Sequence, residues 1–423
     1  MTRMKDSGIE WIGEVPEEWG ITKFKYFLDT NKGLTITKEN LIEDGIPVIN
    51  YGQIHSKYGK SVSADRDELP QVSANYLKFK QSLLKPGDFV FADTSEDIDG
   101  SGNFSTRIDD NGELFAGYHT IKAKLKNALE HDFRYFMHYF DSLAFRKQVQ
   151  NKVSGIKVYS ITQSILQETC LILPSLYEQT QIANFLDKKV AQLDSVKSLL
   201  EEQIKTLEDY SQSLIYETVT KGLDKTVPLK DSGVDWIGQI PEGWGIMRLK
   251  YICGMQSGNN LTSLEISSEN DGGKIFPVYG GNGQRGYYSD FTNEGNYCLV
   301  GRQGALAGNI HFVSGKFWAT DHAIVVYEHT HTYSKYLYYL LKVMNLNQYA
   351  FETSAQPGLS VEKILQLETI HCPKGEQSQI ADFLDKKTEQ INQMIAIKKE
   401  QIENINKQRQ TLIYDYVTGK RRV

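Results

Sequence analysis

Cysteine is scarce in this sequence, and the few cysteines lie far apart. The 423 residues include only four, none in a CxxC pair: Cys170, Cys253, Cys298 and Cys372. A disulfide framework and a structural zinc site are therefore not expected, and unpaired thiols suit a reducing cytoplasm.

Long apolar runs and a strong excess of one charge are also missing. No apolar run is long enough to span a bilayer, and residues 1–11 do not resemble a secretory signal peptide. The formal net charge is −6, which argues against a chain coated in positive charge but leaves room for local basic patches. We expect a cytoplasmic protein, and the length predicts two or more domains.

Proline is absent from residues 178–222, and the only glycine there is the last residue. Ser175 precedes Glu178 by three residues, as in a helix capping box. These features predict one long helix that ends at Gly222. A heptad stripe on this helix predicts a partner helix, and its leucines are Leu186, Leu193, Leu200, Leu207 and Leu214.

The same chain holds a second copy of this segment. Residues 376–420 match residues 178–222 at 20 of 45 positions, at an offset of 198. Leu384, Ile391, Ile405 and Leu412 repeat the stripe, with Lys398 in the middle place. Two similar long helices in one chain predict an intramolecular coiled coil.

A short Trp-rich arm is repeated as well. Residues 6–27 match residues 231–252 at 13 of 22 positions. The chain is therefore two half-units, each with an arm, a globular stretch and a long helix, joined near Pro228. We expect the tryptophans and part of the helix stripe to serve helix packing or partner-subunit contacts. This packing set is Trp11, Trp19, Phe185, Leu186, Leu193, Leu200, Trp236, Trp244, Phe383, Leu384 and Ile391.

The two globular stretches correspond but have diverged, mostly in their loops. Residues 46–49 correspond to 276–279, and residues 87–91 to 295–299. Short apolar segments between Gly and Asn turns predict α+β domains of mainly antiparallel strands with short helices. The expected divisions are an arm and first domain at 1–173, a long helix at 174–224, a linker arm and second domain at 225–372, and a long helix at 373–423.

Motifs for catalysis or cofactor binding are incomplete. Residues 281–286 fit GxGxxG, but a strand-like segment follows where a dinucleotide fold needs a helix. No GxxxxGK[ST] loop occurs, and the Asp-Lys-Lys runs that begin at Asp187 and Asp385 are expected to be solvated charges on the helices. His329 and His331 lack an evident third metal ligand. We expect no catalytic centre, metal or cofactor in this chain.

Polar residues suited to reading nucleic acid gather in the Gly-bearing loops of both stretches. Arginine can pair with guanine through two hydrogen bonds, and asparagine or glutamine can do so with adenine. Any one of these residues alone could be an ordinary surface residue, but the duplicated placement predicts DNA contacts. The candidates are Asn50, Gln53, Lys57, Lys60, Asn103, Arg107, His119, Lys157, Asn282, Gln284, Arg285, Arg302, Gln303, Lys316 and His322.

A family resemblance rests on four sets of residues. They are the arms at 6–26 and 231–251, residues 277–283, residues 300–304 with 321–323, and the helix starts at 178–187 and 376–385. Together they make the sequence similar to the specificity subunit of a type I restriction–modification system over nearly its whole length.

This resemblance implies two target-recognition domains in a pseudo-twofold repeat, each reading one half of a split site in double-stranded DNA. It implies two long antiparallel helices as the spacer. It also implies two modification subunits that carry S-adenosylmethionine and methylate adenine, and restriction subunits that use ATP and Mg²⁺. The chain itself would be a non-catalytic subunit in a prokaryotic cytoplasm.

One feature departs from the repeat. The acidic run from Asp93 to Asp99 stands where the second half has Gly301 to Gly304. A carboxylate is a poor neighbour for phosphate, so the first domain is expected to read its half-site through other residues. A coiled-coil scaffold that binds protein without DNA sequence specificity is the alternative interpretation.

Overall fold

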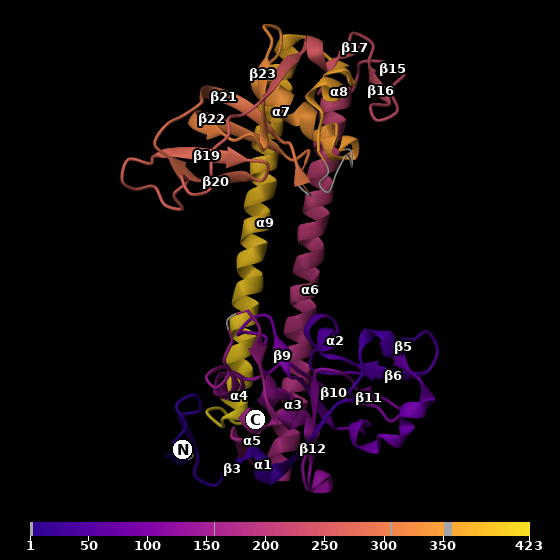
Figure 1. Ribbon diagram of the computed structural model, residues 1–423, viewed down its shortest axis with the longest axis vertical. Coiled ribbons are helices and arrows are strands. Elements are labelled where there is room, and N and C mark those ends of the chain that lie inside the picture. Colours follow the sequence, from indigo (N-terminus) through magenta and orange to yellow (C-terminus); the bar gives the residue numbers. More distant parts are fainter. Residues whose placement is uncertain (1–2, 156, 305–306, 351–357) are drawn as a thin grey trace. The chain divides into compact units, whose positions relative to one another are not determined.

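The chain divides into two compact units. The computed structural model describes residues 3–155, 157–304, 307–350 and 358–423. Unit 1 contains residues 1–200 and 400–423, and unit 2 contains residues 201–399. Each unit holds one globular stretch and a part of both long helices (Figure 1).

The two long helices are α6 (Leu176–Lys221) and α9 (Lys374–Val417). The Glu178 N–H donates to the Ser175 hydroxyl, and the Ser175 N–H donates to the Glu178 carboxylate, which is the predicted capping box. Both helices begin two residues before Glu178 or Glu376; in α6 this is because the glutamate of a capping box is the third helical residue, whereas α9 follows Pro373, which has no capping side chain. Gly222 and Gly419 follow the helices at φ +72° and +73°, the left-handed conformation that ends a helix.

The helices pack antiparallel, as the contacts inside each unit show. As the residue number rises along α6, the number of its partner on α9 falls. Lys398 donates to Gln203 at 2.6 Å in unit 2 and keeps the same register. Three pairs set this direction in unit 1: Glu178 with Arg422, Phe185 with Tyr416, and Asp194 with Arg409.

Unit 1 builds its globular stretch from two four-stranded sheets, β10-β8-β12-β4 and β11-β6-β7-β5. Neighbouring strands are antiparallel, apart from the parallel pair β11 and β6. Helices α3 and α4 share a core of buried phenylalanines with the first sheet. The bounds are β4 (Leu28–Lys32), β5 (Leu41–Ile42), β6 (Ile46–Ile49), α2 (Tyr51–Ser56), β7 (Gln71–Val72), β8 (Phe89–Ala92), β10 (Phe104–Thr106), β11 (Phe115–Ala116), β12 (Thr120–Leu125), α3 (Phe133–Asp141), α4 (Leu143–Gln150) and α5 (Gln163–Gln167).

Unit 2 joins the equivalent strands into one six-stranded sheet of order β18-β23-β21-β22-β19-β20. Strand β22 pairs antiparallel with β21 and, at its end, parallel with β19. In unit 1 the same path is divided between β10 and β11, which separates the two sheets. The bounds are β18 (Cys253–Ser257), β19 (Phe276–Gly280), β20 (Gly283–Tyr288), β21 (Asn293–Gly301), β22 (Ile310–Ala319), β23 (Ala323–Glu328), α7 (Ser334–Val343) and α8 (Val361–Leu365).

The arms and their strands are duplicated in both units. The hairpin β1 and β2 in unit 1 has the same register as β15 and β16 in unit 2. A second short pair, β3 with β14, likewise repeats as β17 with β24. The bounds are β1 (Met4–Asp6), β2 (Glu14–Pro16), β3 (Gly20–Lys23), α1 (Phe24–Phe27), β14 (Cys170–Leu173), β15 (Leu229–Asp231), β16 (Gln239–Pro241), β17 (Gly245–Arg248) and β24 (Glu368–His371), with β9 (Thr94–Ser95) and β13 (Tyr159–Ser160) as a further pair in unit 1.

The strand pairing corrects one sequence correspondence. Residues 87–91 were expected to match 295–299, but Ala92 pairs with Thr120 where Gly301 pairs with Ala323. The offset is therefore 209 rather than 208. A shift of one residue reverses which side chains face the core. The corrected register places Phe91 and Val300 in the equivalent large cores of the two units.

Membrane spans and disulfides are not features of the described residues. None of the described helices has an apolar stretch sufficient to cross a bilayer. All four cysteines are free thiols, and burial raises the pKa of Cys253 and of Cys372 to about 12. These thiols are therefore protonated at neutral pH.

Candidate nucleic-acid interface

In unit 2 a hairpin turn packs against the backbone of two candidate residues. The turn lies between β19 and β20, where Gly280 pairs with Gly283. A Cβ at Gly281 would lie 3.1 Å from the His322 carbonyl oxygen and 3.8 Å from the Arg302 nitrogen. Glycine thus allows the turn to approach this backbone closely. The fold brings Asn282, Arg302 and His322 together, and we name these three the Arg302 cluster.

The Arg302 cluster is polar and open to its surroundings. The Arg302 N–H donates to the His322 carbonyl at 2.9 Å. In the described part of the chain, no hydrogen bond or ion pair involves the Arg302 guanidinium. Gln303, Gln284 and Arg285 are exposed on the adjoining segments. Together these side chains offer donors and acceptors around this hairpin, with the consecutive Gln284 and Arg285 on opposite faces of β20.

Lys316 lies apart from the Arg302 cluster. It is opposite Glu294 in the β21–β22 pair, with its Nζ 3.8 Å from the carboxylate and 4.6 Å from the Phe291 ring centroid. Ile310, six residues earlier on β22, is opposite Val300. Six residues of strand are roughly 20 Å, so Lys316 does not belong to the Arg302 cluster.

In unit 1, Asn50 and Gln53 hold the start of helix α2. The Asn50 side chain caps this helix, its Oδ1 accepts from the Tyr118 N–H at 3.0 Å, and the Asn50 N–H donates to Gln53 Oε1 at 3.1 Å. Asn50 is buried. Both residues therefore position the Tyr118–His119 turn in this structure.

Arg107 and Lys60 are engaged inside unit 1. The Arg107 guanidinium is 2% exposed and donates to the carbonyl oxygens of Leu84, Asp109, Asn111 and Gly112. A base could pair with it only if these bonds broke, so the structure gives Arg107 the role of a loop clamp. The Lys60 amine lies 3.3 Å from the Asp141 carboxylate.

Asn103 belongs to a small network in unit 1. Its Nδ2 lies 2.9 Å from His55 Nδ1, and its Oδ1 accepts from Arg146 at 2.6 Å. His55 Nε2 lies 2.8 Å from the Thr94 carbonyl oxygen. The network ties α2 and α4 to the acidic loop. Lys57 and Lys157 are exposed beside it.

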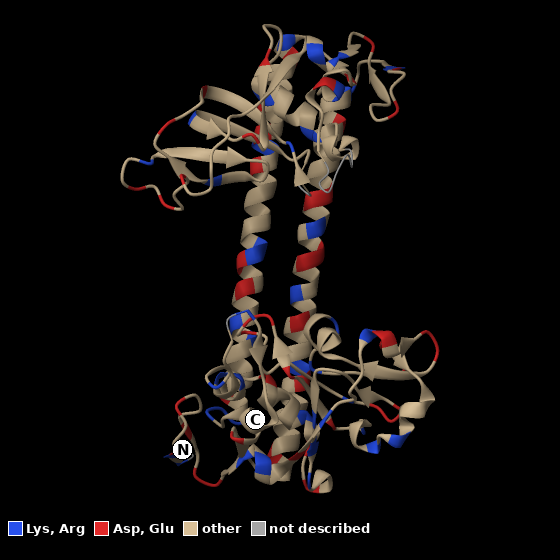
Figure 2. Ribbon diagram, in the orientation of Figure 1, with Lys and Arg blue, Asp and Glu red and all other residues tan. Residues whose placement is uncertain are grey.

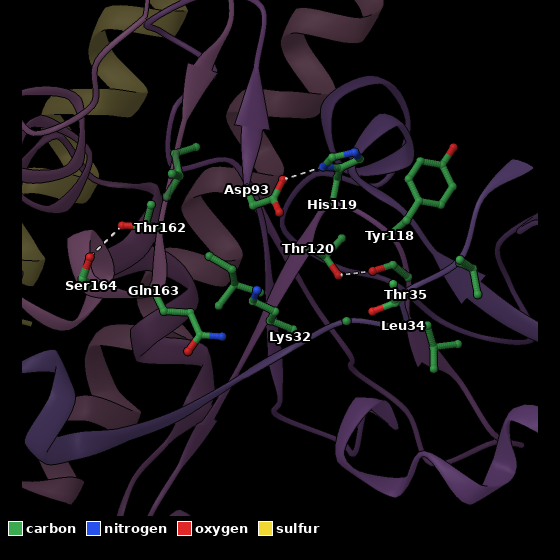
Figure 3. A pocket seen from close by; sticks show the side chains of 15 residues that line it. Lys32, Leu34, Thr35, Asp93, Tyr118, His119, Thr120, Thr162, Gln163 and Ser164 are labelled. Atoms are coloured by element: carbon green, nitrogen blue, oxygen red, sulfur yellow. Dashed lines mark hydrogen bonds and ion pairs between the residues drawn. The ribbon is translucent and has the colours of Figure 1, made fainter.

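His119 is the candidate that lines a hollow in unit 1. The cavity has a volume of about 580 Å³. Figure 3 shows Lys32, Thr35, Asp93, His119 and Gln163 among the side chains that line it. His119 Nδ1 lies 3.1 Å from Asp93 Oδ1. Sequence reasoning set Asp93 aside as an unfavourable charge and missed this pair. The missing signal was that Asp93 occupies the position equivalent to Arg302. Only the strand pairing reveals this equivalence.

The packing set lies along the helices and arms. Trp19 and Trp244 are buried and donate from Nε1 to Glu178 at 3.2 Å and Glu376 at 3.0 Å. Leu186, Leu384 and Ile391 are buried. The remaining members are half-buried: Trp11, Phe185, Leu193, Leu200, Trp236 and Phe383.

The Asp-Lys-Lys runs are not simply solvated, as had been expected. Asp187 accepts from Arg134 at 3.2 Å and lies 2.7 Å from His138 Nε2. Asp385 pairs with Lys335, which raises the pKa of that lysine, and accepts from Tyr339 at 2.8 Å. The same helix position thus docks each globular stretch. The retention of both aspartates at an offset of 198 was the available sequence signal.

The glycine motif and the candidate metal ligands can also be placed in the structure. The 281–286 glycines form a hairpin and strand β20, with no helix to receive a dinucleotide. Among the described residues, no group of three His, Cys, Asp or Glu side chains could hold a metal ion. Figure 2 shows acidic and basic residues interspersed along the exposed parts of α6 and α9, rather than a continuous basic face.

The fold defines a duplicated α+β protein with two similar globular units and paired long helices. The family of the type I restriction modification DNA specificity domain matches residues 16–206 and 241–405. The chain belongs to this family. Its members are the specificity subunits of type I restriction–modification systems, which do not carry the catalysis.

Named relatives and a solved structure agree with this family. The EcoprrI specificity subunit of Escherichia coli is 40% identical over 138 residues, which cover 33% of this chain and 34% of that subunit. The MjaVIII specificity subunit of Methanocaldococcus jannaschii is 25% identical over 97% of this chain and 94% of its own length. A chain from a structure of a type I R-M complex has the same fold, with a TM-score of 0.70 at 16% identity, over 96% of this chain and 99% of that one.

Proposed function

We propose that this chain directs a type I restriction–modification complex to a bipartite DNA target, with one half-site read by each unit. The observation that carries this proposal is the contrast within the repeat. The arms and helices are duplicated closely, whereas the loops around His119 and around the Arg302 cluster differ in length, sequence and charge. One scaffold that presents two different readers suits a target with two different halves.

The continuous helices would set the gap between the half-sites. Helix α6 has 46 residues and α9 has 44. At 1.5 Å per residue each is roughly 65–70 Å long, which limits the span to roughly 20 base pairs of duplex. Insertion of one helical turn in both helices is expected to lengthen the gap in the target and leave the half-sites unchanged. An unchanged gap would contradict the proposal that helix length sets the spacing of the half-sites.

Two modification subunits are the proposed partners. Each helix exposes a pair of large apolar side chains at equivalent positions: Val196 and Leu199 on α6, Met394 and Ile397 on α9, each about half exposed. The offset is 198 for both pairs. A duplicated apolar pair suits two copies of one partner, one on each unit.

The chemistry would then belong to the partners. The modification subunits would hold S-adenosylmethionine and methylate adenine, and restriction subunits would use ATP and Mg²⁺. With a net charge of −6, this chain would bind phosphates weakly alone, and the partners would supply the missing contacts. A complex that reads chromosomal DNA would act in the prokaryotic cytoplasm.

A modified-base map tests the proposal. DNA would be sequenced from cells that express this chain together with the modification subunit encoded beside it. The expected result is a split motif with N6-methyladenine in both halves and a fixed gap. Replacement of residues 277–304 is expected to alter one half only. A soluble complex that binds every duplex equally would instead favour the coiled-coil scaffold.

A further inference from the structure

Units 1 and 2 place opposite charges at one equivalent position. The Asp93 N–H donates to the His119 carbonyl at 3.0 Å, and the Arg302 N–H donates to the His322 carbonyl at 2.9 Å. Each residue directly follows an equivalent central strand, β8 or β21. Asp93 is therefore the counterpart of Arg302, and unit 1 presents a carboxylate where unit 2 presents a guanidinium.

The Asp93 carboxylate is held in place through one of its two oxygens. Oδ1 lies 3.1 Å from the His119 ring and accepts from the Thr94 hydroxyl at 2.7 Å. Within the described ranges, no hydrogen bond involves Oδ2. The Asp93 side chain is 33% exposed. One oxygen is thus oriented by two partners, and the other remains an acceptor within reach of a ligand.

His119 is itself fixed in an uncommon conformation. Its φ of +55° lies in the left-handed region, which non-glycine residues rarely adopt unless their surroundings enforce it. Its ring makes edge contacts with Tyr51 at 5.4 Å and Tyr118 at 5.9 Å between centroids. Figure 3 shows the His119 and Asp93 side chains pointing toward one another at the cavity. The pair is a positioned polar feature on a concave surface.

We propose that Asp93 reads an exocyclic amino group, cytosine N4 or adenine N6, in the half-site of unit 1. Arg302 reads guanine at the corresponding place in the half-site of unit 2. This inference rests on the proposed function. An ionised carboxylate only accepts hydrogen bonds, so it pairs with amino donors and rejects the O6 and N7 acceptors of guanine. It also repels phosphate, which favours contact with a base edge over contact with the backbone.

A binding selection tests this inference with the full-length chain assembled with its modification subunits. The probe is a pool of random duplexes, selected at low ionic strength and sequenced. Asp93→Asn adds a donor to the side chain, so one base position in one half-site is expected to lose a preference of roughly tenfold or more. The other half-site is expected to persist. Arg302→Gln is expected to remove a guanine preference from that other half-site.

Two further variants separate base reading from folding. Glu96→Gln makes the same charge change at an exposed position of the same loop, and its selected motif is expected to equal that of the wild type. Asp93→Glu keeps the acceptor and moves it by one methylene, so the same position is expected to weaken without a new base appearing. Thermal unfolding midpoints establish that each variant is folded.

The outcomes distinguish this inference from the proposed function. If the wild-type complex enriches a split motif and Asp93→Asn leaves every position unchanged, the inference is overturned and the proposed function stands. If binding weakens for every sequence and the motif is unchanged, Asp93 has only a structural role, and the inference is also overturned. If the wild-type complex with its modification subunits enriches no sequence, the proposed function and the inference fall together.

Discussion

Units 1 and 2 hold their arms to the long helices through equivalent contacts. They differ in the space between α6, α9 and the globular stretch, which ion pairs occupy in unit 1 and a cavity occupies in unit 2. In unit 1, Arg409 of α9 is buried and pairs with Asp141 and Asp194. The equivalent residues in unit 2 are Ser211, Lys342 and Asn392, by offsets of 198 and 201. They line a cavity of about 600 Å³.

The comparison separates contacts that both units retain, between the arms and the helix ends, from the space beside each globular stretch, which differs between the units. Tyr414 donates to the Ile12 carbonyl in unit 1 and Tyr216 to the Ile237 carbonyl in unit 2, both at 3.0 Å. Contacts that hold the arm at a helix end are therefore duplicated. The space between α6, α9 and each globular stretch has been free to diverge, because each stretch is also docked through Asp187 or Asp385.

The largest expected effect concerns the retained contacts. Trp19→Ala and Trp244→Ala should each destabilise the protein by about 3–5 kcal/mol, because each removes a buried indole. The loss at Trp19 should be larger by about 0.5–1 kcal/mol, since Arg422 stacks on its ring at 5.1 Å. Denaturant unfolding followed by circular dichroism measures both.

A matched pair of milder variants controls for misfolding. Trp19→Phe and Trp244→Phe keep most of the apolar contact and lose the hydrogen bond to Glu178 or Glu376. Their effects should be smaller than those of the alanine variants and equal to each other. If one alanine variant is nearly neutral, the two arms are not equivalent.

The second prediction breaks the buried Arg409–Asp141 ion pair of unit 1, which has no equivalent in unit 2 because Ser211 replaces the arginine there. Arg409→Met should cost about 3 kcal/mol, because it leaves the Asp141 carboxylate buried with less compensation. Ser211→Ala, at the equivalent position, should change stability by less than about 0.5 kcal/mol. The free energies of unfolding from urea titrations test this contrast.

A double variant shows whether charge is the cause. Asp141→Asn with Arg409→Met removes both partners and should recover much of the loss of Arg409→Met alone. If the double variant is as unstable as the single one, packing of the arginine stem explains the effect.

The third prediction asks whether the exposed apolar pairs are equivalent. Leu199→Lys and Ile397→Lys should each weaken one contact with a modification subunit by about 2 kcal/mol, because a large apolar side chain is no longer buried. The mass of the assembled complex, measured by light scattering, should fall from two modification subunits to one in either variant. The double variant should bind none.

Ser198→Lys serves as the control for added charge. Ser198 is exposed next to Leu199, so this variant should retain two modification subunits. Full assembly of the Leu199→Lys and Ile397→Lys variants would exclude the apolar pairs as the docking surface.

The smallest effect concerns acid sensitivity at the second short strand pair. In unit 1, Lys23 and Lys25 donate to Glu168 and lower its pKa from 4.5 to about 2. A lowered carboxyl pKa contributes stability above pH 4.5, which is lost as the pH falls toward 2. Unit 2 has Arg248 and Gln366 there, at 3.1 Å, and Gln366 does not titrate.

Glu168→Gln should therefore flatten the acid limb of stability between pH 4.5 and 2, and leave the profile above pH 5 with the same slope. Unfolding midpoints across this range measure the effect. Gln366→Glu should introduce a new acid-sensitive step in unit 2. Parallel profiles for the wild type and Glu168→Gln would contradict the assignment.

Much of the architecture could be predicted because it depends on local pattern. The absence of proline, the heptad stripe and the terminal glycines determine long helices, and Gly222 and Gly419 end them at positive φ as expected. The duplicated arms predict duplicated packing. The candidate DNA residues were harder to predict, since residue type shows only what a side chain can donate or accept. Arg107 has the chemistry of a base reader and is a buried clamp.

By itself, the sequence determined the twofold repeat, the paired helices and the family, because periodicity and internal identity survive without coordinates. The tertiary structure decided which charged residues occupy equivalent positions and which of them form ion pairs. It shifted one strand register by a residue, which makes Arg302 rather than Gly301 the counterpart of Asp93. It also placed Asp187 and Asp385 in ion pairs rather than in solvent. These ion pairs join residues 49 to 53 positions apart in the chain, and only the closed fold specifies the distance between them.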